Sequence, residues 1–230
     1  EVLGWAENRQ NYSVDYKVLE GPTDEQAVWD KLEEYLSQEF LRQDGSPMHI
    51  KYSCIDSGYL TQMVYTFCEK FGSTRCCPVK GSDTMLTFVS QPKNVNITRN
   101  GVKVGTTMLR NLGSSIVKEQ IYSMLKLKVD LETGEIPRGY CFFPATRDAY
   151  YYKGLCSEVN RTILNKKVWV KITDRNEPLD LRCYAYVAGY LEGITRKDND
   201  WFQTQIAQMV PLREEFTQAP KKPRAKSTWL

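Results

Sequence analysis

The strongest constraint on the fold is an alternating strand pattern that ends in an aspartate and passes directly into a helical pattern. Residues 48–55 alternate in the way of a half-buried β-strand, and Asp56 follows them at once. Apolar residues then recur at helical spacing: Leu60, Met63, Val64, Phe67 and Cys68. Open α/β sheets place ligands at the carboxyl ends of their strands, just before the helices. The sequence therefore predicts an α/β fold with Asp56 in the functional region.

A second inward-facing carboxylate is predicted near the other end of the chain. Pro178 suits the first turn of a helix that would run to about residue 191. One face of this helix would carry Asp180, Tyr184, Val187 and Leu191. Asn176 stands at the N-cap position of this helix. A cap residue that lies beside a metal site would also orient the backbone there. Two roles are open for Glu177, because it either faces solvent or supplies an additional oxygen to the site.

The remaining pattern predicts strands first and then alternating helices and strands. Thr23 and Gln26 have the spacing of a capping box, which would start a helix that ends at about Phe40. Residues 82–113 are rich in turn formers and are read as a loop or a β-insertion. The other expected elements are an opening hairpin (2–5 and 12–19), a short strand (75–80), a helix (114–127), a strand (140–143), a short helical region (150–158) and a strand (168–172). This order suits a mixed β-sheet flanked by helices on both faces.

Composition excludes several classes of protein. The net charge of +3, from 31 basic and 28 acidic residues, is too balanced to indicate nucleic-acid binding, so any DNA contact must come from a local patch. No phosphate-binding loop of a P-loop ATPase occurs, and the lone His49 lacks a serine nucleophile motif. No apolar run approaches the ~20 residues that cross a bilayer, which predicts no membrane partner. Seven cysteines, an odd number without a Cys-x-x-Cys spacing, favour a reduced cytoplasm.

Two carboxylates on separate elements suit metal-dependent phosphodiester chemistry. The hard cations Mg²⁺ and Mn²⁺ prefer carboxylate oxygens, and they can activate water and stabilise a leaving oxygen. Asp56 and Asp180 are the candidate ligands. Spacing alone favours structural roles for both residues: Asp56 as a turn or cap residue and Asp180 as a first-turn acid stabilised by the helix dipole. Lys80, between a strand and a glycine, is either a phosphate contact or a solvated charge.

Several short segments carry a family resemblance. They are Asp-Ser-Gly-Tyr at 56–59, Pro-Val-Lys-Gly at 78–81, Lys-Glu-Gln-Ile-Tyr at 118–122, Phe-Pro at 143–144, and Asn-Glu-Pro-Leu-Asp at 176–180 followed by Tyr-Ala. In this order they resemble the carboxyl-terminal nuclease domain of lambda-type phage terminase large subunits. The resemblance implies a ribonuclease H-like fold, with a nuclease domain over residues 1–195 and a carboxyl-terminal extension with a basic tail over residues 196–230.

The resemblance also implies roles for individual residues. Asp56 and Asp180 would be the catalytic metal ligands, with Asn176, Glu177 and Glu158 as auxiliary groups around them. Lys80 and Lys118 would contact DNA, although Lys118 by its pattern alone is an ordinary exposed helix residue. The family's first metal-binding aspartate lies on a strand that comes before the position of residue 1, so we expect that strand to be absent from residues 1–230.

The implied function is a Mg²⁺- or Mn²⁺-dependent endonuclease that cuts double-stranded concatemeric DNA during genome packaging. Its expected partners are the upstream ATPase domain, the small terminase subunit and the phage portal, in the host bacterial cytoplasm. The basic tail at 220–226 would meet a partner. Two alternatives are open: another ribonuclease H-like nuclease such as a resolvase or transposase, and a docking module for DNA or portal without catalysis of its own.

Overall fold

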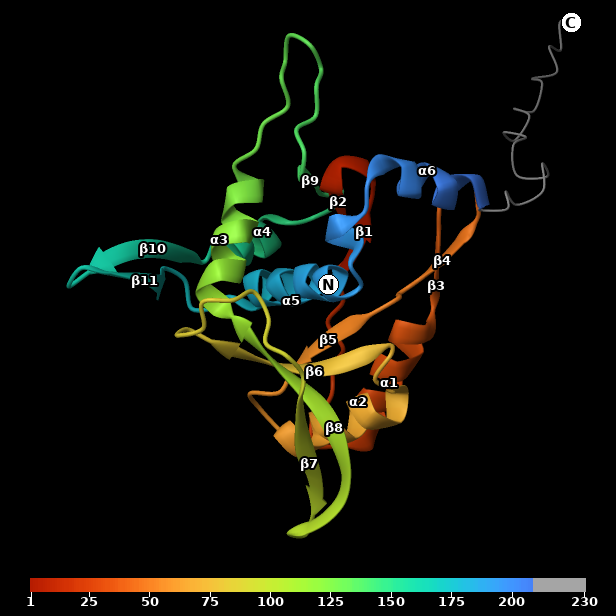
Figure 1. Ribbon diagram of the computed structural model, residues 1–230, viewed down its shortest axis with the longest axis vertical. Coiled ribbons are helices and arrows are strands. Elements are labelled where there is room, and N and C mark those ends of the chain that lie inside the picture. Colours follow the sequence, from red (N-terminus) through yellow and green to blue (C-terminus); the bar gives the residue numbers. More distant parts are fainter. Residues whose placement is uncertain (209–230) are drawn as a thin grey trace, which may run out of the picture.

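Two β-sheets lie beside a single long helix, α5 (Glu177–Leu191), which packs against a strand of each (Figure 1). The structure is a computed structural model that describes residues 1–208. Because α5 contacts both sheets, side chains on its faces can meet residues from distant parts of the chain. The predicted basic tail lies outside the described residues.

The larger sheet holds Asp56 at the end of an edge strand. Its strand order is β5 (Ser53–Asp56), β6 (Cys76–Ser82), β8 (Val102–Gly113) and β7 (Lys93–Arg99). The first three strands are parallel, and β7 is antiparallel to β8. Helix α2 (Thr61–Phe71) connects β5 to β6, as parallel neighbours require. Asp56 pairs in register with Val79, so its side chain emerges at the carboxyl edge of the parallel strands.

The smaller sheet has the order β1 (Val2–Trp5), β2 (Asn11–Asp15) and β9 (Cys141–Phe142). Strands β1 and β2 form the predicted opening hairpin, joined by the 3-10 turn η1 (Glu7–Arg9). Two separate hairpins complete the strands: β3 (Glu39–Leu41) with β4 (Pro47–His49), and β10 (Glu158–Ile163) with β11 (Lys166–Lys171). The second of these projects to the left of α3 in Figure 1.

Helices cover both faces of the larger sheet because β6 is apolar on both sides. Cys77 and Val79 face a core shared with α3 (Ser114–Leu125) and α5, whereas Cys76 faces a core shared with α1 (Gln26–Ser37) and α2. Three further helical segments are α4 (Ala149–Leu155), η2 (Ile194–Arg196) and α6 (Asn199–Gln208). The predicted α/β class is confirmed. Within residues 1–208, no helix has the length and apolar character needed to cross a membrane.

Three local predictions are wrong. Residues 48–55 are not one strand, since β4 pairs with β3 and β5 pairs with β6, in different sheets. Alternation survives the break between them, so the pattern could not reveal it. Glu158 does not belong to a helical region but begins β10. The capping box is not formed: α1 starts at Gln26, and its N-cap, Glu25, makes no side-chain capping bond. Residues 82–113 include the hairpin β7–β8, in line with the β-insertion alternative.

Candidate functional site

Asp56 is fixed by the turn that follows β5 and is exposed to solvent. The amide of Gly58 donates to Asp56 Oδ1 at 3.0 Å. Ser57 holds the same turn against β6, because both its amide and its hydroxyl donate to the carbonyl of Val79 at 2.8 Å. The N-cap of α2 is Leu60, in the left-handed region at φ 45°, so Asp56 does not cap that helix. Its carboxylate is left directed out of the sheet edge.

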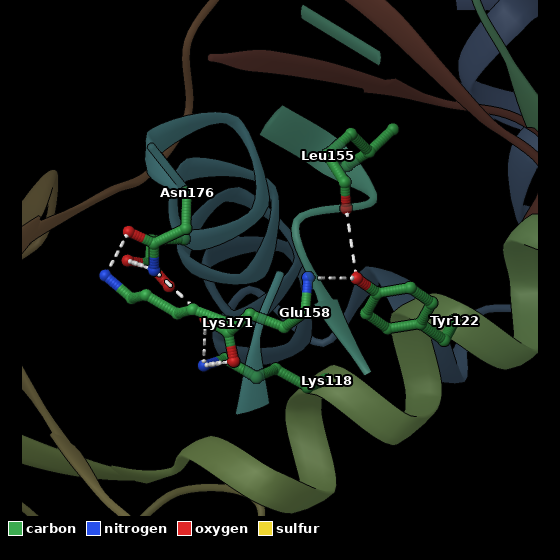
Figure 2. A network of polar contacts seen from close by, with 7 residues as sticks. Lys118, Tyr122, Leu155, Glu158, Lys171 and Asn176 are labelled. Atoms are coloured by element: carbon green, nitrogen blue, oxygen red, sulfur yellow. Dashed lines mark hydrogen bonds and ion pairs between the residues drawn. The ribbon is translucent and has the colours of Figure 1, made fainter. Parts of the chain in front are cut away.

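Asp180 is held by the side chain that was expected to cap its helix. Asn176 occupies the N-cap position of α5 but makes no side-chain capping bond. Its Nδ2 instead donates to Asp180 Oδ2 at 2.8 Å and to Glu158 Oε1 at 3.0 Å, while its Oδ1 accepts from Lys171 Nζ at 2.8 Å. One amide therefore connects two acids and a lysine, and its orientation is fixed by all three (Figure 2).

Glu158 is buried and paired with Lys118. Lys118 Nζ lies 2.9 Å from Oε1 and 2.7 Å from Oε2, with side-chain exposures of 14% for the lysine and 3% for the glutamate. The hydroxyl of Tyr122 accepts a hydrogen bond from the Glu158 amide at 3.2 Å and donates to the carbonyl of Leu155 at 3.4 Å (Figure 2). These contacts anchor the start of β10 against α3 and beside the first turn of α5.

The charges of Asp56 and Asp180 influence the pKa values of groups in this region. Burial raises the pKa of Asp180; the charges of Lys118 and Lys171 oppose this shift, and those of Glu158 and Asp56 add to it. Burial also raises the pKa of Tyr184. The charges of Asp56 and Asp180 add to this shift, as does a hydrogen bond that the Tyr184 hydroxyl donates to Asp56. Tyr184 is four residues after Asp180 on α5, so it reaches from the helix toward the end of β5.

The other predicted site residues divide into two groups. Glu158 and Asn176 join Asp180, and Lys118 joins them through Glu158. Glu177 does not, since it is exposed and its Oε2 lies 3.4 Å from Arg175 Nε. Lys80 is exposed on β6, the strand next to that of Asp56, and forms no ion pair with any of residues 1–208.

The sequence predicted no role in the site for Lys171, Tyr122 or Tyr184. Tyr184 could have been found, because it follows Asp180 by one helical turn on the predicted inward face. Lys171 could not, because only the folding of β11 back along β10 brings it to Asn176.

Asp56 and Asp180 fit a hard divalent cation as two of its ligands. Both are carboxylates, and Asp180 Oδ1 accepts no hydrogen bond from the described residues. Glu158 does not add a third available carboxylate, because Lys118 holds both of its oxygens. Among residues 1–208, no three or more His, Cys, Asp or Glu side chains are grouped so as to hold a metal ion. The arrangement is thus an open pair of ligands beside a fixed polar network.

Comparisons with known proteins give a consistent result. The family described as "Terminase large subunit gpA, endonuclease domain" matches residues 1–201. The chain is 28% identical to the terminase large subunit of Escherichia phage lambda, over 96% of this chain and 34% of that protein. It is 26% identical to the terminase large subunit of Enterobacteria phage P21, over 95% of this chain and 33% of that protein. The chain thus spans about a third of the length of these relatives. No solved structure matches it.

Proposed function

This chain belongs to the family of terminase large subunit gpA endonuclease domains, and from that membership we propose that it cuts double-stranded concatemeric DNA during phage genome packaging. The observation that carries the proposal is the family match over residues 1–201, which includes both Asp56 and Asp180. A resolvase or transposase is set aside because the family is that of the terminases.

We propose Asp56 and Asp180 as the catalytic, metal-binding pair for Mg²⁺ or Mn²⁺. A bound divalent cation supplies an activated water and charge stabilisation for phosphodiester hydrolysis. The chain's own contribution is orientation. Asn176 fixes the Asp180 carboxylate, Tyr184 donates to Asp56, and the Lys118–Glu158 pair holds Asn176 from the other side. A carboxylate held in one rotamer loses less entropy when it binds a ligand.

The fold and its domain boundaries are also proposed from the family membership. We propose a ribonuclease H-like nuclease unit over residues 1–195 and a separate carboxyl-terminal extension over residues 196–230. Parallel strands β5, β6 and β8 with helices on both faces, and an antiparallel hairpin β1–β2 beside them, support this assignment. Helix α6, in the proposed extension, folds back on η1 through paired hydrogen bonds between Asn199 and Asn8.

The proposed partners follow from the family. They are double-stranded DNA, the terminase ATPase domain, the small terminase subunit and the phage portal, in the host bacterial cytoplasm. Within this chain, Lys80 is proposed to contact DNA phosphates because it is exposed beside the strand that ends in Asp56. Lys118 is better placed to hold Glu158 than to meet a phosphate.

A second candidate function is a docking module without catalysis, favoured by the lack of a three-ligand metal group within residues 1–208. The deciding experiment is cleavage of linear duplex DNA by the intact protein with Mg²⁺ or Mn²⁺ titrated against EDTA. We expect metal-dependent cutting that EDTA abolishes. DNA that binds but is never cut at any metal concentration would favour the docking module.

A further inference from the structure

A groove lies between helix α3 and the hairpin β10–β11, outside the carboxylate site. It has a volume of about 550 Å³ and is lined by Glu119, Tyr122, Ser123, Lys126, Asn160, Thr162, Lys167 and Trp169. Figure 1 shows the hairpin projecting beside α3. None of the lining residues is a proposed metal ligand.

One face of the hairpin links the groove with the residues that hold Asp180. Glu158 pairs in register with Lys171 at the hairpin's base, Asn160 with Trp169 further out, and Thr162 with Lys167 beyond them. Alternate residues of a strand share a face, so these six side chains form one row. Its base contacts Asn176, and Asn176 contacts Asp180. The same face of the hairpin therefore carries both residues of the groove and residues that contact Asn176.

The groove presents unpaired positive charge over an aromatic wall. Within residues 1–208, Lys126 and Lys167 form no ion pair, whereas Glu119 receives a hydrogen bond from Asn160 at 3.3 Å. Both lysines are exposed. Tyr122 and Trp169 stack with ring centroids 5.1 Å apart at 25° and form the wall. The buried Trp169 Nε1 has no hydrogen-bond partner among the described residues.

We propose that this groove binds the sugar-phosphate backbone of one DNA strand as it leaves the cleavage site, with Lys126 and Lys167 on its phosphates. The proposal deepens the proposed function and rests on it for the identity of the ligand. Lysines contact phosphates as point charges, and aromatic side chains pack against sugars and bases. Lys171 and Lys167 are four residues apart, or roughly 13 Å along a strand, which matches about four nucleotides of axial rise.

The test compares two double variants of the intact protein. Lys126→Ala/Lys167→Ala removes both groove charges. The matched control, Lys31→Ala/Lys70→Ala, removes two exposed lysines from α1 and α2, which pack on the other face of the larger sheet. Binding to a labelled duplex is measured in EDTA by fluorescence anisotropy at several salt concentrations. Cleavage kinetics are measured with Mn²⁺.

We expect the groove variant to bind on the order of tenfold more weakly, with the slope of log affinity against log salt smaller by about 2, since each lost phosphate contact reduces it by about 1. KM should rise with kcat unchanged, because the lysines hold the DNA and do not touch the reacting atoms. The control should behave as wild type, and Lys126→Arg/Lys167→Arg should retain binding.

The outcomes separate this inference from the proposed function. A groove variant with wild-type KM and salt slope overturns the groove assignment and leaves the proposed nuclease function intact. A groove variant that impairs packaging alone also overturns the groove assignment, and it would indicate a protein partner. Wild-type protein that binds DNA through these lysines but never cuts it overturns the proposed nuclease and supports the groove. Wild-type protein that does not bind DNA overturns both.

Discussion

The side chain of Asn176 joins the acids of the candidate site. The sequence indicates a helix cap at this position. The unpaired backbone amides of a first helical turn commonly donate hydrogen bonds to the side-chain oxygen of such a cap. In the structure the Oδ1 atom of Asn176 is taken by Lys171, and its Nδ2 by Asp180 and Glu158. The residue type was therefore predictable and its role was not, because the partners come from β10 and β11, which adjoin α5 only after folding.

The first prediction concerns the proposed metal ligands. Asp56→Asn and Asp180→Asn should each abolish DNA cleavage in the intact protein, because the amide keeps the shape of the side chain but loses the charge that a hard cation needs. Folding should be nearly unchanged, as judged by circular dichroism and thermal melting. Glu177→Gln is the matched control, since its carboxylate is exposed and directed to Arg175. Retained cutting by either aspartate variant would refute that assignment.

The second prediction concerns the buried pair Lys118–Glu158. Lys118→Met should destabilise the protein by roughly 3–5 kcal/mol, because it leaves the nearly inaccessible carboxylate of Glu158 without its cation. The double variant Lys118→Met/Glu158→Gln should recover part of this loss, since the second change removes the uncompensated charge. Urea denaturation of the single and double variants measures both effects. A double variant as unstable as the sum of the two single ones would show that the pair is not coupled.

The third prediction concerns pH and Tyr122. Burial raises the pKa of Tyr122 to about 12. An unfolded tyrosine ionises near pH ~10, so between these values the unfolded chain loses a proton that the folded chain keeps. This contribution to stability is present below pH ~10 and is lost as the pH rises toward 12. Urea midpoints measured from pH 9 to pH 11 should fall less steeply for Tyr122→Phe than for wild type. Identical slopes would contradict the assignment.

At the scale of elements, the contact of α5 with β1 depends on a glycine in the last turn of the helix. Glycine costs about 1 kcal/mol in this position relative to alanine, so its presence calls for a packing reason. A Cβ at Gly189 would lie 2.6 Å from Cζ2 of the Trp5 ring, closer than atoms can approach. The indole of Trp5 also packs on Tyr186, with ring centroids 5.3 Å apart. The helix thus lies directly on the tryptophan of β1.

The fourth prediction follows from this contact. Gly189→Ala should destabilise the protein by about 1–3 kcal/mol, because the added methyl pushes α5 away from β1 and overpacks the core. Trp5→Leu/Gly189→Ala should be more stable than the sum of the single variants predicts, since the smaller side chain leaves room for the methyl group. Thermal or urea unfolding of the four proteins forms the cycle. Strict additivity of the changes in the free energy of unfolding would mean that residue 189 and Trp5 are not coupled.

Elements with one clear apolar face were predictable, and those defined by distant partners were not. The helices α2, α3 and α5 follow their apolar periodicity, and the parallel strand β6 follows from a continuous apolar run. The break between β4 and β5 left no trace in the alternation. Strand β10 has five exposed or half-buried residues after Glu158, so it lacks the apolar pattern that signals a strand. Its structure comes from pairing with β11.

At the scale of the whole molecule, α5 connects the elements that carry the two carboxylates, because it packs against one strand of each of two sheets that do not pair with each other. Among residues 1–208, β1 is the edge strand of one sheet and β5 is the edge strand of the other, and α5 packs on both. The sequence placed Asp56 at a strand end and Asp180 on an inward helix face. It could not show that the two elements are adjacent, because adjacency depends on the packing of the entire chain.

The last prediction concerns the two open strand edges. Both β1 and β5 have unpaired edges among the described residues, and the proposed metal-binding pair Asp56 and Asp180 supplies two carboxylates. Two carboxylates bind a divalent cation more weakly than three, since each ligand charge adds to the affinity. Residues 1–230 should therefore bind at most one weakly held cation, and a longer version in which a further strand pairs with β1 or β5 and adds a carboxylate should cut DNA far faster. Both versions are compared in the same buffer with Mn²⁺ titrated, by cleavage and by calorimetry. Equal activity of the two versions would mean that Asp56 and Asp180 suffice, or that another residue of this chain completes the site.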